Sequence, residues 1–277
     1  MKYKILVLDI DGTLTNSKKE ITPATKQALY HLQKRGVRVA IASGRPTAGT
    51  KMVQEALRLS EFHNFILSFN GAKITDCGSG ETVYEQVLPP SAISEIYRAA
   101  IGYGTGLISY EGDDVIAATP IDPYMELEAK INGLLIRRVP DFADYITFPV
   151  NKCLMTGAPE YLAEVERRMQ KQFGERLSIY RSEPYFLEFM PPNVDKAKSL
   201  EKLLDKLSLT RTEMVCCGDG FNDISMIEYA GLGVAMANAQ ASVRARADYV
   251  TASNDEDGIV LVAEKFFGDH ALICHTE

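Results

Sequence analysis

Residues 4–15, KILVLDIDGTLT, constrain the fold more than any other stretch of the chain. The apolar run ILVL at 5–8 is typical of a strand buried on both faces of a parallel sheet. Asp9 and Asp11 follow, and because side chains alternate along an extended chain, both carboxylates can point to one side where the strand ends. Like charges at the end of a buried strand are costly, so we expect a cation or a charged ligand between them.

Composition limits the class of protein. The 277 residues are 46% hydrophobic and 24% charged, which indicates a globular chain of one large or two moderate domains. The net charge of -7, without a basic face, argues against nucleic-acid binding. No apolar window approaches the length of a membrane span, and Asp9 and Asp11 interrupt any signal-like core near the N-terminus. We therefore expect a cytoplasmic location and no membrane partner.

The five cysteines are odd in number and form no spaced C-x-x-C pairs of the zinc-binding kind: Cys77, Cys153, Cys216, Cys217 and Cys274. We predict reduced, structural thiols. The adjacent pair at 216 and 217 precedes an acidic glycine-rich turn, but small buried residues are expected in a core strand there.

The first 70 residues alternate between strand and helix patterns. Thr22 followed by Pro23 predicts a helix start, and Gly36 closes the apolar stripe of that helix. Strands are expected at 37–42 and 65–69, with a helix at 47–59 between them. This order predicts a doubly wound parallel α/β sheet of the Rossmann-like type.

The pattern changes between residues 82 and 189. Shorter, more alternating strand candidates and amphipathic helices near 91–101 and 159–173 predict an inserted α+β domain with its own small antiparallel sheet. The α/β pattern resumes with a helix at 196–207, a strand at 214–217 and a closing helix at 255–267, whose start Asp255, Glu256 and Asp257 are expected to cap. We therefore divide the chain into a core, 1–81 and 190–277, and an inserted domain, 82–189.

Polar residues follow several predicted strands or begin predicted helices, which is where ligands gather in open parallel sheets. They are Asp9, Asp11, Ser43, Gly44, Asn70, Lys196, Asp219, Asn222 and Asp223. Clustered aspartates without histidine or paired cysteine favour Mg²⁺ over zinc. A lysine and a serine beside the metal favour a phosphoryl group, and an aspartate can then act as a nucleophile with a second carboxylate as acid and base.

Four ordered motifs, DIDGT at 9–13, SGR at 43–45, Lys196 and GDGFND at 218–223, resemble those of haloacid dehalogenase (HAD) superfamily phosphatases. The large insertion after NGA at 70–72 resembles the Cof-type subfamily, whose type IIB cap lies there. The resemblance implies a HAD core with an inserted cap that selects the substrate.

The resemblance also implies roles for single residues. Asp9 would be the nucleophile and a Mg²⁺ ligand, and Asp11 the acid/base and a ligand through its carbonyl oxygen. Asp219 and Asp223 would complete the metal site. The residues expected to hold phosphate are Ile10 and Gly44 through their amides, Ser43, Lys196 and Asn222. The third motif departs from the usual Lys-Gly, because Ala197 follows Lys196.

We expect a Mg²⁺-dependent phosphomonoester hydrolase acting on small phosphorylated metabolites, sugar phosphates first. Candidate selectors of the leaving group are Arg45, Asn70, Arg181 and Glu188. A phosphomutase on the same scaffold and a non-catalytic Mg²⁺-dependent phosphate or metabolite sensor remain alternatives. A glycosidase ranks last, because its two carboxylates would flank the scissile bond from opposite sides. The chain is expected to be a monomer or a small homo-oligomer.

Overall fold

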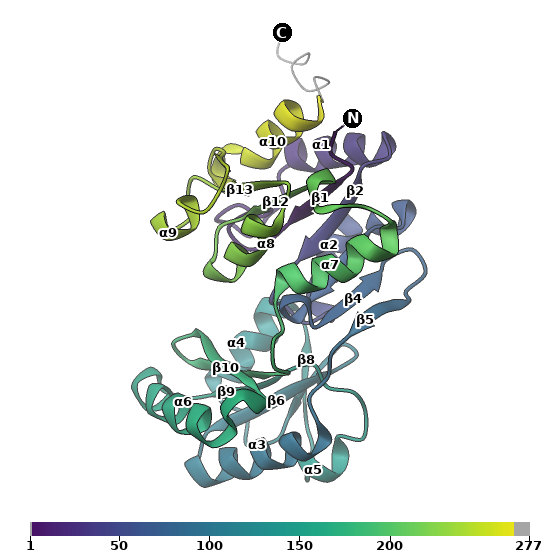
Figure 1. Ribbon diagram of the computed structural model, residues 1–277. Helices are drawn as coiled ribbons and strands as arrows, with labels where there is room; N and C mark the ends of the chain where they lie inside the picture. Colours follow the sequence, from purple (N-terminus) through teal and green to yellow (C-terminus); the bar gives the residue numbers. More distant parts are fainter. Residues whose placement is uncertain (1, 269–277) are drawn as a thin grey trace. The chain divides into compact units, whose positions relative to one another are not determined.

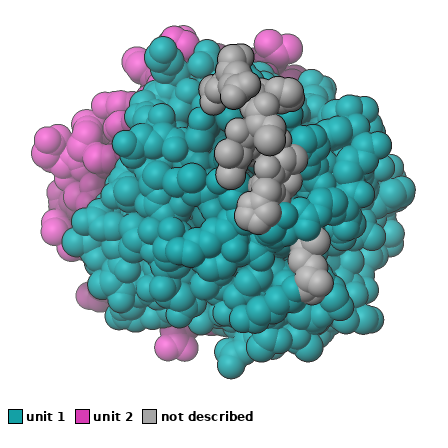
Figure 2. Space-filling model, turned by 90° about the horizontal axis from the view of Figure 1, so that it is seen from above, with its two compact units in different colours: residues 1–44, 51–84, 195–277 teal, residues 45–50, 85–194 magenta. Residues whose placement is uncertain are grey.

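The computed structural model describes residues 2–268. The chain divides into two compact units: unit 1 contains residues 1–44, 51–84 and 195–277, and unit 2 contains residues 45–50 and 85–194 (Figure 2). Among the helices of the described residues, none combines the length and apolar character needed to cross a membrane.

Unit 1 is built on an eight-stranded sheet with the order β14-β13-β12-β1-β2-β3-β4-β5 (Figure 1). Neighbouring strands from β14 to β3 are parallel, and β4 is antiparallel to β3. Its strands are β1 (Ile5–Leu8), β2 (Arg38–Ala42), β3 (Phe65–Ser68), β4 (Lys73–Asp76), β5 (Thr82–Glu85), β12 (Met214–Gly218), β13 (Leu232–Ala235) and β14 (Tyr249–Val250). The predicted largely parallel α/β sheet is confirmed.

Helices cover both faces of this sheet, which explains the unbroken apolar run of β1. Leu6 and Leu8 pack in the cluster that includes α1 and α10, whereas Ile5 and Val7 pack with α7 and α8. All four side chains are fully buried. The helices of unit 1 are α1 (Pro23–Lys34), α2 (Lys51–Ala56), α7 (Lys196–Leu207), α8 (Ile224–Tyr229), α9 (Ala241–Arg244) and α10 (Gly258–Phe267), with 3-10 turns η2 (Leu59–Phe62), η3 (Phe69–Gly71), η5 (Arg211–Glu213), η6 (Phe221–Asp223) and η7 (Asn254–Glu256).

Unit 2 has a separate six-stranded sheet with the order β10-β11-β9-β6-β7-β8. Its pairs are antiparallel except β7 and β8, which are parallel, so the prediction of an antiparallel sheet is wrong at that edge. The strands are β6 (Gly106–Glu111), β7 (Asp114–Ala117), β8 (Leu135–Arg138), β9 (Cys153–Thr156), β10 (Ser178–Glu183) and β11 (Phe186–Met190).

The two faces of the second sheet are covered unequally. Helices α3, α5 and α6 pack on one face around Leu107 and Met155, and α4 packs on the other around Ile108 and Leu154 (Figure 1). The helices of unit 2 are α3 (Pro90–Tyr103), α4 (Pro123–Asn132), α5 (Phe142–Tyr145) and α6 (Pro159–Phe173), with 3-10 turns η1 (Ala48–Thr50) and η4 (Gly174–Arg176).

Three predicted elements need correction. The helix expected at 47–59 is broken: η1 precedes a short α2, and Arg58 adopts a left-handed backbone with φ 55°. Strand β5 was expected in the inserted sheet but lies at the edge of the eight-stranded sheet. The closing helix begins at Gly258 rather than 255.

Of the acidic residues expected to cap that last helix, Asp257 is its N-cap residue, but the Asp257 side chain makes no capping hydrogen bond to α10. Asp255 accepts hydrogen bonds from the amide and hydroxyl of Ser17, and Glu256 forms a capping box with Ser253 across η7. Asp257 accepts from the hydroxyls of two threonines near the start of α1, Thr22 and Thr25. The side chains of Asp255 and Asp257 therefore connect segments that are distant in the sequence, whereas Glu256 closes η7.

Four cysteines are free and buried, as the sequence predicts: Cys77, Cys153, Cys216 and Cys217. Burial raises the pKa of Cys77 to about 12, which keeps the thiol protonated. Cys274 lies outside the described residues.

Candidate active site

The carboxyl ends of four adjacent strands, β12, β1, β2 and β3, carry the predicted polar residues. Asp9 follows β1, Ser43 follows β2, Asn70 lies just after β3, and Asp219 follows β12. Because these strands are parallel neighbours, their carboxyl ends share one edge of the sheet.

At this edge Lys196 joins two carboxylates. Its Nζ lies 2.7 Å from Asp9 Oδ1 and 2.6 Å from Asp223 Oδ1. The exposed fractions are 7% for Asp9, 1% for Lys196 and 0% for Asp223, so the three charges are withdrawn from water. Buried charges of this kind are retained only where each is paired.

The start of α7 places Lys196. Asp195 is the N-cap, and its Oδ1 accepts hydrogen bonds from the amides of Ala197 at 2.9 Å and Lys198 at 3.2 Å. Ala197 thus takes part in an ordinary first helical turn. The departure from Lys-Gly at this motif leaves the lysine in contact with both carboxylates.

The turn after β12 fixes Asp223 and Asp219. Asp223 Oδ2 accepts from the amides of Asp219 at 3.0 Å and Gly220 at 2.8 Å. Asp219 Oδ1 accepts from Thr13 Oγ1 at 2.7 Å. Gly12, with φ 84°, lies so close that a Cβ there would be 2.2 Å from Asp219 Oδ2. Sequence reasoning gave Thr13 no role, although its place in DIDGT was the available signal.

Asp9, Asp219 and Asp223 form an acidic cluster. One carboxylate oxygen from each lies within 4.8 Å of the others, which suits a bound metal ion. Hard carboxylate oxygens are ligands that Mg²⁺ prefers. The single ammonium of Lys196 cannot neutralise three carboxylates, so the cluster favours a further cation.

The pKa values express this excess of negative charge. Burial, followed by the charge of Asp223, raises the pKa of Asp9 from 3.8 to about 7 despite Lys196. Burial is also the largest cause that raises the pKa of Asp219 to about 6. Burial alone would lower the pKa of Lys196, but the charges of Asp223 and Asp9 raise it above its ordinary value. The lysine is therefore an ammonium at neutral pH.

Asp11 has a different environment from Asp9. Its side chain is partly exposed, and Oδ1 lies 2.9 Å from Nζ of Lys19, a residue with φ 63° that sequence reasoning did not single out. Asp11 is not among the three clustered carboxylates of the described residues. It is thus the more accessible member of the DIDGT pair.

The other residues expected to hold phosphate lie along the same edge. Ser43 is buried, and its carbonyl accepts from the amide of Asn70 at 2.9 Å. Asn222 is exposed and donates from Nδ2 to Asn70 Oδ1 at 3.0 Å. Gly44 approaches Asn70, because a Cβ on Gly44 would lie 3.2 Å from its Oδ1. The carbonyl of Ile10 accepts from backbone amides four and five residues later, which fixes the loop after β1.

The remaining predicted selectors lie in unit 2. Arg45 donates from a guanidinium nitrogen to the carbonyl of Gly49 at 3.4 Å. Arg181 donates from Nε to Glu166 Oε2 at 2.8 Å. Glu188 is buried and accepts from Nζ of the equally buried Lys152 at 2.9 Å.

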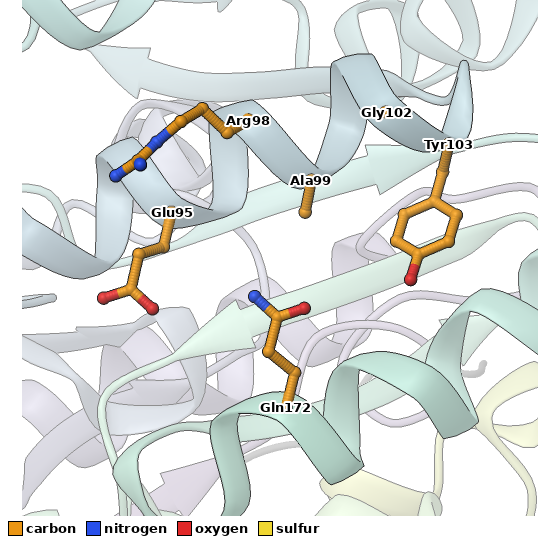
Figure 3. Close-up of a pocket in the computed structure, with 6 residues that line it drawn as sticks. All are labelled: Glu95, Arg98, Ala99, Gly102, Tyr103 and Gln172. Carbon is orange, nitrogen blue, oxygen red and sulfur yellow. The ribbon is translucent and has the colours of Figure 1, made fainter.

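Unit 2 also has a surface pocket of about 390 Å³ between α3 and α6 (Figure 3). Its lining residues are Glu95, Arg98, Ala99, Gly102, Tyr103 and Gln172. No predicted site residue lines it, so this pocket does not belong to the acidic cluster.

A family model for haloacid dehalogenase-like hydrolases matches residues 6–262. The chain belongs to this family. A solved haloacid dehalogenase-like hydrolase from Bacteroides thetaiotaomicron is 45% identical, with a TM-score of 0.92 over 95% of this chain and 99% of that one. The predicted superfamily and fold, a HAD core with an inserted cap, are confirmed.

Two further relatives bear on the reaction. The structure of the HAD subclass IIB sugar phosphatase BT4131 is 28% identical, with a TM-score of 0.78 over 96% of this chain and 99% of that chain. The 5-amino-6-(5-phospho-D-ribitylamino)uracil phosphatase YcsE of Bacillus subtilis (strain 168) is 28% identical over 256 residues, 92% of each chain. The present chain is thus a HAD-family phosphatase of the Cof-type, subclass IIB, acting on phosphorylated metabolites.

Proposed function

We propose that the protein is a Mg²⁺-dependent phosphomonoester hydrolase that works through an aspartyl-phosphate on Asp9. The observation that carries this proposal is the buried contact of Asp9 with Lys196 at the end of β1, beside Asp219 and Asp223. The contact with Lys196 fixes the orientation of the Asp9 carboxylate, and therefore the direction from which it can attack phosphorus. The ammonium of Lys196 can also stabilise negative charge on the phosphoryl oxygens.

The metal would be held by Asp9, Asp219 and Asp223, with the carbonyl of Asp11, and would neutralise charge on the phosphoryl group when bound. An Asp9 oxygen attacks phosphorus, and the bond from phosphorus to the leaving oxygen breaks. Asp11 gives its proton to that oxygen, then takes a proton from the water that cleaves the aspartyl-phosphate. The phosphoryl oxygens are held by the side chains of Ser43 and Asn222 and by the backbone amides of Ile10 and Gly44.

We propose phosphorylated sugars and related polyols as the substrate class. The sugar phosphatase and the ribityl-phosphate phosphatase among the relatives support this choice. In unit 2, Glu188 Oε2 is buried and has no hydrogen-bond partner among the described residues, whereas its Oε1 is paired with Lys152. An unpaired buried carboxylate oxygen is costly, and a substrate hydroxyl would satisfy it. Arg45 and Arg181 remain further candidates for contacts with the leaving group.

The direct test assays purified protein with Mg²⁺ against sugar, nucleotide and cofactor phosphates and a generic aryl phosphate, measuring released phosphate. We expect hydrolysis that requires Mg²⁺ and is greatest with sugar phosphates. Asp9→Asn should abolish turnover while the circular dichroism spectrum and melting temperature show a folded protein. Wild-type rates in Asp9→Asn would contradict the covalent mechanism, and isomerised sugar phosphate without free phosphate would indicate a mutase.

A further inference from the structure

The turn after β3 is held in a conformation that non-glycine residues adopt rarely. Phe69 and Asn70 have φ of 52° and 54°, and Gly71 follows with φ 95°. Two consecutive non-glycine residues with positive φ are strained, and such backbone persists only where surrounding contacts impose it.

Asn70 connects this turn to the residues expected to hold phosphate. Its amide donates to the carbonyl of Ser43 at 2.9 Å, and its Oδ1 accepts from Asn222 Nδ2 at 3.0 Å. Asn70 is only 8% exposed, whereas Asn222 is exposed. The buried side-chain carboxamide of Asn70 thus limits the positions that the Asn222 side chain can take.

The other end of the turn is attached to the helix that carries Lys196. Ser199, three residues after Lys196 in α7, donates from Oγ to the carbonyl of Gly71 at 2.7 Å, and both groups are buried. A Cβ on Gly71 would lie 2.3 Å from Ser199 Oγ, so the approach requires glycine. The turn and the first part of α7 are therefore packed together without space between them.

We propose that Asn70 is a positioning residue and that the turn Phe69–Gly71 sets the spacing between Asn222 and Lys196. This inference rests on the proposed function, in which these two side chains hold the same phosphoryl group. It gives Asn70 a role in binding the phosphoryl group, which every substrate shares, instead of a role in choosing the leaving group.

Asn70→Gly is the informative variant, because glycine accepts positive φ and only the side-chain amide is lost. We expect kcat/KM for an aryl phosphate to fall about ten- to a hundredfold. The inhibition constant of inorganic phosphate should rise in parallel. Mg²⁺ affinity measured by calorimetry should stay unchanged, since the clustered carboxylates are those of Asp9, Asp219 and Asp223. The matched control is Asn193→Gly, an exposed asparagine with φ 62°, which should retain wild-type kinetics.

A double-mutant cycle decides whether Asn70 acts through Asn222. In an Asn222→Ala background, Asn70→Gly should cost little more, because the side chain that it positions is already absent. An equal further loss in that background would overturn the inference and indicate direct contact with substrate. Wild-type kinetics in Asn70→Gly would overturn it as well.

Ser199→Ala removes the hydrogen bond at the other end of the turn. If Asn70→Gly does not fold, this variant still tests whether the turn sets the spacing between Asn222 and Lys196. It should lower kcat/KM and weaken phosphate inhibition together while circular dichroism shows a folded protein. Unchanged phosphate inhibition in Ser199→Ala would overturn the proposed spacing. A wild-type enzyme without Mg²⁺-dependent hydrolysis would instead reject the proposed function itself.

Discussion

Asp9 is under two opposed influences, because Lys196 favours its charge while burial and neighbouring carboxylates disfavour it. Burial and the neighbouring carboxylates have the larger effect: the pKa of Asp9 is raised to about 7 and that of Asp219 to about 6. A bound cation would reverse the balance by stabilising the charged forms. The three buried carboxylates therefore favour a bound cation.

The metal-free protein should lose stability as pH rises from about 4 to about 7. Both folded-state pKa values exceed the ordinary value of 3.8, so over this interval the native state binds more protons than the unfolded state. The free energy of unfolding then falls with rising pH. Melting temperatures measured with a chelator should show a shallower fall for Asp9→Asn, and Mg²⁺ should stabilise the wild type more at pH 8 than at pH 5. Identical pH slopes for the two proteins would contradict the raised pKa.

Gly12 offers a second prediction, with a matched control at Gly36. Both have φ near 83°, but a Cβ at Gly12 would lie 2.2 Å from Asp219 Oδ2, whereas, chain neighbours apart, no atom of residues 2–268 would lie within 4 Å of a Cβ at Gly36. Alanine at either position should cost about 1 kcal/mol from the backbone conformation. Only Gly12→Ala should also weaken Mg²⁺ binding, measured by calorimetry. Equal Mg²⁺ affinity in both variants would show that Asp219 moves aside freely.

At the scale of the element, α7 places its first residue, Lys196, beside Asp9 after β1 and Asp223 in η6. Hydrogen bonds from the helix start to Asp195 fix the first turn, and buried leucines attach α7 to one face of the sheet. The position of Lys196 is thus a property of the helix more than of its own side chain.

Removing the cap of α7 should affect both stability and catalysis. Asp195→Ala should cost about 1 kcal/mol in unfolding free energy. It should also lower kcat/KM about tenfold, because Lys196 loses its fixed position. Asp141→Ala, which removes the N-cap of α5 in unit 2, is the control and should leave kcat/KM unchanged. Denaturant unfolding and steady-state kinetics measure the two effects, and equal kinetics in both variants would contradict the role given to the cap.

The elements that the sequence predicted well are those with fully buried side chains at regular spacing. β1 is apolar on both faces, and α1 has the predicted Thr22 N-cap, whose side chain accepts from the amide of Thr25. α4 and β8 were not predicted; β8 is a largely exposed edge strand with little apolar patterning.

In the site, the acidic motifs could be predicted because carboxylates at strand ends are unusual. Lys19 and Ser199 were not, because only tertiary contacts distinguish them from ordinary surface and helix residues.

At the scale of the whole molecule, each unit has its own sheet and its own core. The acidic cluster belongs wholly to unit 1, and the buried pair Lys152 and Glu188 belongs to unit 2. This separation allows reaction chemistry and substrate choice to be tested independently.

Glu188→Gln should change substrate preference without changing the reaction. Replacing the carboxylate by a neutral amide weakens a hydrogen bond from a substrate hydroxyl, which corresponds to a fall of about tenfold in kcat/KM for sugar phosphates. Hydrolysis of an aryl phosphate, which has no such hydroxyl, should be unaffected. Arg176→Gln, which breaks an exposed ion pair with Glu95, is the control. Equal losses on both substrates would mean that Glu188 supports the fold of unit 2 and does not select.

Unit 2 is not a single continuous insertion, because residues 45–50, directly after Gly44, belong to it. Within this segment Gly49 packs so closely on α4 that a Cβ would lie 2.3 Å from Asn132 Oδ1. A fragment covering only 85–194 would leave that surface of α4 uncovered. Chimaeras that exchange substrate preference between relatives should therefore carry residues 45–50 together with residues 85–194. For the same reason, we expect substitutions in these two separated stretches to be coupled in evolution.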